Sequence, residues 1–168
     1  MTDKEEHGRK LFMAHPDVKV SQRGGNCIDC HSQFLTSGFR DKLDGFSNNG
    51  IDADADLDDG LMATTKDPSH RGLFKVPTLR NIAITGPYMH DGRFATLEDV
   101  MNHYNGGVKI SRTLSPLILE ADNEKVDPTK STGLQLSPNE VEAIIAFLHT
   151  LTDEKFLNES KFTNPFNR

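Results

Sequence analysis

Cys27, Cys30 and His31 are the residues whose types and spacing most directly predict chemistry. The chain has two cysteines, three positions apart, and a histidine follows the second at once. A disulfide across so short a loop would constrain almost nothing. A zinc site would need a second Cys/His pair at ligand spacing, and a redox CxxC pair would need a βαβ context. The run Cys27-Ile28-Asp29-Cys30-His31 instead predicts covalent attachment of one c-type haem, with His31 as the proximal iron ligand.

The sixth position of the iron decides what such a haem does, because the axial ligand is the main control on its potential. Four residues with donor atoms compete for it, namely Met89, His90, Met101 and Tyr104, and His103 is a poorer fifth. Met101 and Tyr104 lie on the inward stripe of a predicted helix, whereas His103 lies off it and is predicted to face solvent. A methionine or tyrosine on an inward face is usually core. Spacing alone therefore leaves the choice open.

Three helices must position these residues. A Thr2/Glu5 capping box predicts a helix that ends at Pro16, Thr96 caps a helix to about Asn105, and Ser137 with Glu140 caps a last helix whose apolar stripe runs to Leu151. A short helical turn is expected directly after Val76-Pro77. Residues 32–69 and 108–136 show no periodicity and are predicted to be long loops. The expected fold is all-α, with residues 1–168 forming one cytochrome c-like domain whose long loops surround the haem.

Composition excludes several classes of function. The net charge is −6 with the acidic residues spread along the chain, which argues against a nucleic-acid partner. No apolar run approaches the roughly 18 residues of a membrane span. The charged opening residues, Met1 to Glu6, do not form a signal peptide. Because c-type haem is attached outside the bacterial cytoplasm, we expect a periplasmic protein whose leader is not in this chain.

A run of acidic residues raises the question of calcium. The run consists of Asp52, Asp54, Asp56, Asp58 and Asp59. An EF-hand needs Gly at its sixth position and Glu at its twelfth, and neither register provides both. We therefore predict a solvated acidic loop, which could dock a basic partner cytochrome.

Residues 74–94 carry a resemblance to a known family. Their sequence, FKVPTLRNIAITGPYMHDGRF, closely resembles the C-terminal haem domain of the bacterial dihaem cytochrome c peroxidase/MauG family. The resemblance extends to residues 8–12, 95–100, 105–107, 114–117 and 146–153, and it includes the haem motif. Nearly the whole chain is covered.

The resemblance implies a particular sixth ligand. The family places it fourteen residues after the histidine of its PYxHDG-type motif, here His90, which gives Tyr104. This position is Met in the peroxidase branch and Tyr in MauG-like proteins, so the chain is similar to MauG here. An anionic phenolate favours ferric iron. We expect low-potential ligation by His31 and Tyr104, with Met101 as the alternative ligand.

Further site residues follow from the same resemblance. It implies a Ca²⁺ held partly by the backbone carbonyls of Thr85 and Pro87, with the rest of that site coming from an N-terminal haem domain. His90 would line the site or order water and a haem propionate, which makes it a candidate catalytic residue together with Tyr104. Arg80 would contact a propionate. For each, ordinary structural hydrogen bonding is the competing interpretation.

The function implied is that of the C-terminal, electron-transfer half of a dihaem oxidoreductase. The chain has one CxxCH and no Trp, the residue that often serves in the family as a relay between haems. The domain would relay or store oxidising equivalents for peroxide-dependent chemistry. Its partners would be an N-terminal haem domain, hydrogen peroxide, and a small cytochrome or a protein electron donor or substrate. The alternatives are a free-standing monohaem electron carrier and a single-haem peroxidase.

Overall fold

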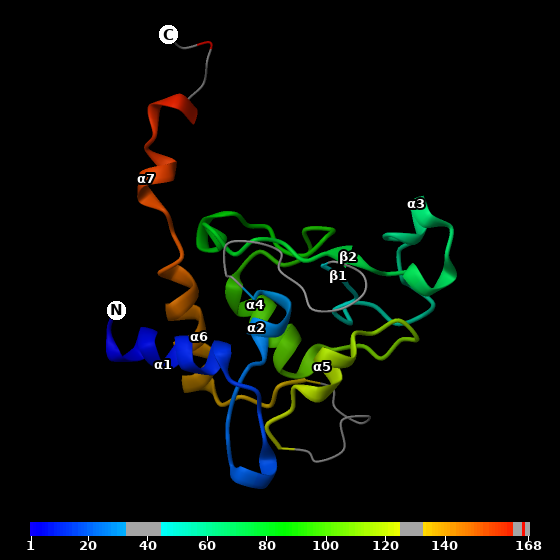
Figure 1. Cartoon of the computed structure of the whole chain (residues 1–168), viewed down its shortest axis with the longest axis horizontal. Helices are drawn as coiled ribbons and strands as arrows, with labels where there is room; N and C mark the ends of the chain where they lie inside the picture. The colour runs from blue at the N-terminus through cyan, green and yellow to red at the C-terminus, as the bar shows by residue number, and fades with distance from the viewer. Residues whose placement is uncertain (33–44, 125–132, 163–165, 167–168) are drawn as a thin grey trace.

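The computed structural model describes residues 1–32, 45–124, 133–162 and 166 (Figure 1). The described part is helical with one small antiparallel sheet, which differs from the purely α-helical expectation. Its α-helices are α1 (Asp3–Met13), α2 (Cys27–Cys30), α3 (Met62–Thr65), α4 (Leu97–Asn102), α5 (Pro116–Glu120), α6 (Pro138–His149) and α7 (Glu154–Leu157). The strands are β1 (Phe46–Ser47) and β2 (Phe74–Lys75).

The longest helices, α1 and α6, form the centre of the core. Both begin at the predicted capping boxes, since the Thr2 amide donates to Glu5 and the Ser137 amide donates to Glu140. The two helices lie against each other at Gly8, where a Cβ atom would sit 1.8 Å from the carbonyl oxygen of Ala143. Only glycine allows backbones to approach this closely, so the contact fixes where α6 lies on α1.

Apolar side chains fill the space around this helix pair. Phe12 and Phe147 meet edge to face with ring centroids 5.5 Å apart, a favoured aromatic geometry. Ile144 is fully buried, and its neighbours in the core include Leu11 and Leu148. The predicted stripe of the last helix therefore faces the core as expected.

Helix α4 begins at Thr96 as predicted, in a capping box with Asp99. It does not continue as an α-helix to Asn105, because residues His103–Gly107 form a π-helical turn. The prediction that His103 faces solvent is wrong, since its side chain is buried. The physical reason is tertiary: the segment after β1 covers this flank of the helix, which the apolar pattern of α4 alone cannot indicate.

The loop regions contain more structure than the sequence predicts. β1 and β2 pair antiparallel, with Phe46 opposite Lys75, and strands of two residues are too short to show an alternating pattern. The helical turn expected directly after Pro77 begins only at Ile82. Helix α5 lies inside the predicted loop 108–136, and Leu114, Ala121, Leu134 and Leu136 of that loop are buried. Residues 33–44 and 125–132 of the two predicted loops lie outside the described residues.

Candidate haem site

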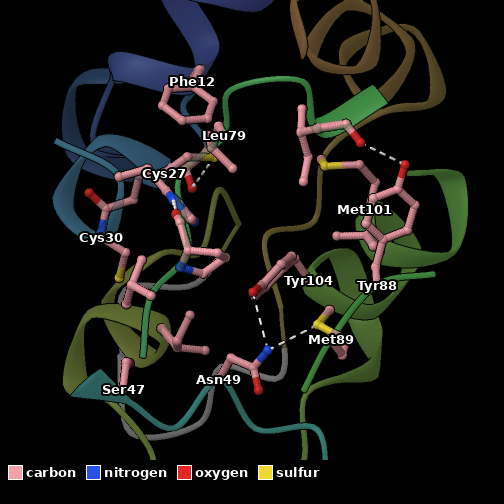
Figure 2. A pocket seen from close by; sticks show the side chains of 18 of the residues that line it. Phe12, Cys27, Cys30, Ser47, Asn49, Leu79, Tyr88, Met89, Met101 and Tyr104 are labelled. Atoms are coloured by element: carbon pink, nitrogen blue, oxygen red, sulfur yellow. Dashed lines mark hydrogen bonds between the residues drawn. The ribbon is translucent and has the colours of Figure 1, made fainter. Parts of the chain in front are cut away.

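A cavity of about 370 Å³ lies where α2, the β1 and β2 segments, α4 and α6 meet. Most of the side chains around it are apolar, and they come from parts of the chain far apart in sequence. In Figure 2, Cys27 and Cys30 lie on one side of the cavity, and Met89, Met101 and Tyr104 lie on the other. We call the side with Cys27, Cys30 and His31 the attachment wall. The side with Asn49, Met89, Met101 and Tyr104 is the facing wall.

The single turn of α2 presents both cysteines of the attachment wall. Asn26 starts it in the left-handed region with φ of 51°, and the His31 amide closes the turn by donating to the Cys27 carbonyl at 2.9 Å. Cys27 and Cys30 are not joined in a disulfide. Burial raises the pKa of the Cys27 thiol to about 12, so this sulfur is protonated at neutral pH. The chain packs closely against this sulfur, because a Cβ atom at Gly25 would lie 3.0 Å from it.

His31 is oriented by one hydrogen bond. Its Nδ1 lies 3.1 Å from the backbone carbonyl oxygen of Pro77, and a carbonyl only accepts, so Nδ1 carries the proton. The lone pair is therefore on Nε2, the atom expected to bind a metal. Burial lowers the pKa of His31 to about 4, which keeps the imidazole neutral near pH 7. Sequence reasoning missed Pro77 because it assigned this residue to the start of a helical turn.

Tyr104 reaches the cavity from the π-helical turn that follows α4. Its hydroxyl points into the cavity in Figure 2, and the side-chain amide of Asn49 donates to it at 3.3 Å. Burial raises the pKa of the Tyr104 hydroxyl to about 12, so the phenol ionises at neutral pH only beside a positive charge. Met101 also lines the cavity and is 4% exposed. The structure thus brings all four main candidates for the sixth ligand to the cavity, with Tyr104, Met101 and Met89 on the facing wall.

Met89 and Asn49 complete the facing wall. Met89 has φ of 71°, a conformation that only a few per cent of residues other than glycine adopt. The Asn49 amide nitrogen lies 3.2 Å from the Met89 sulfur. Asn49 was not singled out by sequence reasoning, because an asparagine in an Asn-Asn-Gly run usually indicates no more than a turn.

His90 lines the cavity at its edge and is held by two contacts. Its ring stacks on Phe74 with centroids 3.8 Å apart and planes 14° apart, and its Nε2 lies 3.1 Å from a carboxylate oxygen of Asp58. The contact with Asp58 joins residue 90 to the acidic segment. The predicted role of His90 beside a propionate remains a prediction, as does its catalytic role.

Arg80 lies outside the set of residues that line the cavity. Its guanidinium donates to Asp153, with Nε at 3.2 Å, and stacks over the ring of Phe156 at 4.5 Å from the ring centroid. Thr85 and Pro87 are exposed, and they flank Gly86, whose peptide bond to Pro87 is cis. The propionate contact and the calcium site remain predictions for these residues.

The acidic segment is less solvated than predicted. Both carboxylate oxygens of Asp52 accept from Arg93, at 2.8 and 2.7 Å, and the Asp52 side chain is only 18% exposed. Asp54 accepts from the backbone amide of Arg112. The solvated-loop prediction is therefore wrong for Asp52, which fastens the segment to the turn that carries Met89. Within the described ranges, no three His, Cys, Asp or Glu side chains are grouped so as to hold a metal ion.

The residues around the cavity fit a covalently attached haem. The attachment wall supplies two thiols on one helical turn and an imidazole whose free lone pair is on Nε2. The facing wall supplies a phenol and two thioethers. The remaining lining is mostly apolar, as a porphyrin requires. In the part of the chain that the structure describes, no helix is long and apolar enough to cross a membrane.

Comparison with known proteins agrees with this site. No family model matches the chain. It is 36% identical over 137 residues to the methylamine utilization protein MauG of Paracoccus denitrificans (strain Pd 1222), covering 67% of this chain and 32% of the relative. It is also 36% identical over 145 residues to the cytochrome-c peroxidase IdrP2 of Pseudomonas sp. (strain SCT), and this match covers 86% of this chain and 32% of the relative.

A solved structure matches nearly the whole chain. The crystal structure of a MauG-like protein associated with microbial copper homeostasis superposes with a TM-score of 0.69 at 29% identity, covering 99% of this chain and 52% of that one. The fold is therefore that of a haem c protein. The chain belongs to the MauG and dihaem cytochrome c peroxidase family, and the matches are consistent with its being a C-terminal haem domain. This confirms the resemblance found in residues 74–94. The chain spans about a third of the length of the curated relatives it matches.

Proposed function

We propose that this chain is the electron-transfer haem c domain of a MauG-like or cytochrome c peroxidase-like oxidoreductase, with His31 and Tyr104 as the axial ligands of its iron. One observation carries the proposal. A single cavity presents the two cysteines and the oriented His31 on one wall and the Tyr104 hydroxyl on the facing wall. A haem held there supplies a one-electron redox centre.

The protein side chains prepare this centre in three ways. Cys27 and Cys30 hold the group in either oxidation state, and the Pro77 carbonyl fixes the tautomer of His31. Ionised Tyr104 would add negative charge, which stabilises the ferric state. The domain is then suited to storing or relaying oxidising equivalents.

The wider assignment follows from family membership. We place the chain in the C-terminal half of a periplasmic dihaem protein, beside an N-terminal haem domain that reacts with hydrogen peroxide. Electrons would come from a small cytochrome or from a protein substrate. Calcium bound by the carbonyls of Thr85 and Pro87 would lie at the junction of the two domains.

The ligand assignment is tested by the visible spectrum of the haem-loaded protein in both oxidation states. We expect Tyr104→Phe to abolish the phenolate-type charge-transfer absorption of the ferric form. It should also raise the equilibrium constant for reduction by at least about tenfold, which corresponds to a rise of about 59 mV in the one-electron reduction potential. Met101→Leu conserves the buried volume and should leave the ferric spectrum unchanged. A Tyr104→Phe protein with the parent's ferric spectrum would contradict the proposal.

A further inference from the structure

We propose that Asn49 is the positioning residue of the facing wall: its side-chain amide holds the Tyr104 oxygen as a hydrogen-bonded ligand and keeps the Met89 sulfur engaged beside it. This inference rests on the proposed ligation by Tyr104 and adds to it a residue that sets the strength of that ligand.

The amide nitrogen of Asn49 contacts two of the three candidate donor atoms of the facing wall. It is 3.3 Å from the Tyr104 hydroxyl oxygen and 3.2 Å from the Met89 sulfur. Dashed lines join Asn49 to both residues in Figure 2. An amide nitrogen donates and does not accept. Both contacts therefore use lone pairs of atoms that could otherwise bind the iron. One side chain thus acts on both the oxygen and the sulfur.

The backbone of Asn49 is fixed to the ligand's own turn. The Nε2 of His103 lies 3.0 Å from the Asn49 carbonyl oxygen and must donate to it. His103 is buried between Phe94 and Tyr104, with ring centroids 5.8 Å and 5.1 Å away. Because His103 and Tyr104 are consecutive in the π-helical turn, one short segment holds both the ligand and the backbone of the residue that donates to it.

A second attachment fixes the segment that follows Asn49. Arg93 donates to the carboxylate of Asp52 and to the backbone carbonyl of Ile51 at 3.4 Å. Arg93 follows Met89 by four residues in the same turn. Asn49 is therefore held from the Tyr104 side through His103 and from the Met89 side through Arg93. The backbone of Asn49 cannot move away from Tyr104 without breaking one of these attachments.

The chemical consequence concerns the electron density on the ligand oxygen. A hydrogen bond to a phenolate draws negative charge toward the donor, so the oxygen gives less charge to ferric iron. Removal of the Asn49 amide would make Tyr104 a stronger donor and stabilise the ferric state further. The reduction potential would then fall, and the charge-transfer band would move to longer wavelength.

The test uses the haem-loaded full chain with Asn49→Leu and Asn49→Asp. Leucine has a similar size without the donor. Ionised aspartate keeps the shape, lacks the donor and adds negative charge. We expect Asn49→Leu to lower the equilibrium constant for reduction by about tenfold, which corresponds to a fall of about 59 mV in the one-electron reduction potential. The charge-transfer band of the ferric form should move to longer wavelength. Asn49→Asp should shift both further in the same direction. Asn158→Leu removes an exposed amide directly after α7 and serves as the matched control, with no shift expected.

A double-mutant cycle separates this inference from the ligand assignment. In a Tyr104→Phe background, Asn49→Leu should shift the potential by much less than in the parent, because the oxygen that Asn49 acts on is gone. If both Asn49 variants keep the parent's band and potential while Tyr104→Phe changes them, the inference about Asn49 is overturned and the ligation stands. If Tyr104→Phe itself changes nothing, the ligation fails first. If the Asn49→Leu protein does not retain haem, the reduction potential and ferric band of the Asn49→Asp protein test the inference about Asn49.

Discussion

The attachment wall of the cavity rests on two packed helices, whereas the facing wall, although Met101 of α4 belongs to the apolar core, depends on hydrogen bonds between loops at Tyr104 and Met89. Behind Cys27 and His31 lie the buried apolar side chains of α1 and α6, which meet at Gly8. Behind Tyr104 lie polar contacts of the segment after β1. Apolar packing resists displacement but has little direction, while hydrogen bonds are directional. The proposed covalent attachment therefore lies where rigidity matters, and the proposed sixth ligand lies where the orientation of one oxygen matters.

The largest effect is expected from breaking the helix pair. In Gly8→Ala the new Cβ atom would overlap the Ala143 carbonyl oxygen, and backbone atoms cannot relieve this by changing rotamer. We expect a loss of at least about 3 kcal/mol of unfolding free energy, measured by urea denaturation, and little haem-bearing protein.

Gly106→Ala is the matched control for that substitution. A Cβ atom at Gly106 would meet nothing within 4 Å, so its unfolding free energy should stay within about 0.5 kcal/mol of the parent. Equal stabilities of the Gly8 and Gly106 variants would show that the helix contact does not support the attachment wall.

A smaller loss of unfolding free energy is expected when the Arg23–Glu140 ion pair, which joins the loop before the haem motif to α6, is broken. Arg23 and two groups of Ser137 donate to Glu140, and the Arg23 guanidinium is the main reason that the pKa of Glu140 falls to about 2. A pKa lowered on folding adds stability above the unfolded value of about 4.5, and this stability is lost as the pH falls toward 2.

Glu140→Gln should therefore cost about 1.5 kcal/mol at pH 7 and remove this acid dependence. The measurement is the unfolding free energy between pH 7 and pH 2 for the parent and the variant. Glu142→Gln, which breaks an exposed pair with Lys4, should leave the slope close to that of the parent. Parallel curves for the parent and the Glu140 variant would exclude a role for this pair in acid stability.

The smallest change in unfolding free energy is expected from a substitution beside the facing wall, where only hydrogen exchange nearby should respond. Arg93→Gln removes the paired contact with Asp52, a partly exposed ion pair worth about 1 kcal/mol. Hydrogen exchange should accelerate at Gly50, whose amide donates to Asn48 in the adjoining segment, and stay unchanged at Gly25 on the attachment wall.

Arg112→Gln is the matched control, because its side chain is 86% exposed and it pairs with Asp54 in the same acidic segment. Arg112→Gln should change hydrogen exchange at neither Gly50 nor Gly25. Acceleration at Gly25 as well as Gly50 would mean that the two walls open together, and the distinction between them would fail.

Local signals made part of this structure predictable. The capping boxes at Thr2, Thr96 and Ser137 predicted where three helices begin, because a cap is a contact between residues three apart. The run from Cys27 to His31 predicts haem attachment by residue type and spacing; the structure places these residues at one cavity, and the attachment itself stays a prediction. Residues 74–94 predicted the family, which the comparisons confirmed.

Contacts between distant segments could not be predicted in the same way. His103 was expected to face solvent, yet it is buried and donates to Asn49, 54 residues earlier. Arg80 pairs with Asp153, 73 residues later, while its expected contact with a propionate stays a prediction. Neither partner shares a periodic pattern with the residue it meets. Such partners become evident only when loops from different parts of the chain pack together.

The sequence by itself determined which residues could hold a haem and which helices support them, since these depend on neighbours within a few positions. Only the tertiary structure decided how the site is completed. It placed the Pro77 carbonyl on His31 and the Asn49 amide between Tyr104 and Met89. The physical reason is that a hydrogen bond depends on the position of two atoms in space, and the spacing of their residues along the chain does not fix that position.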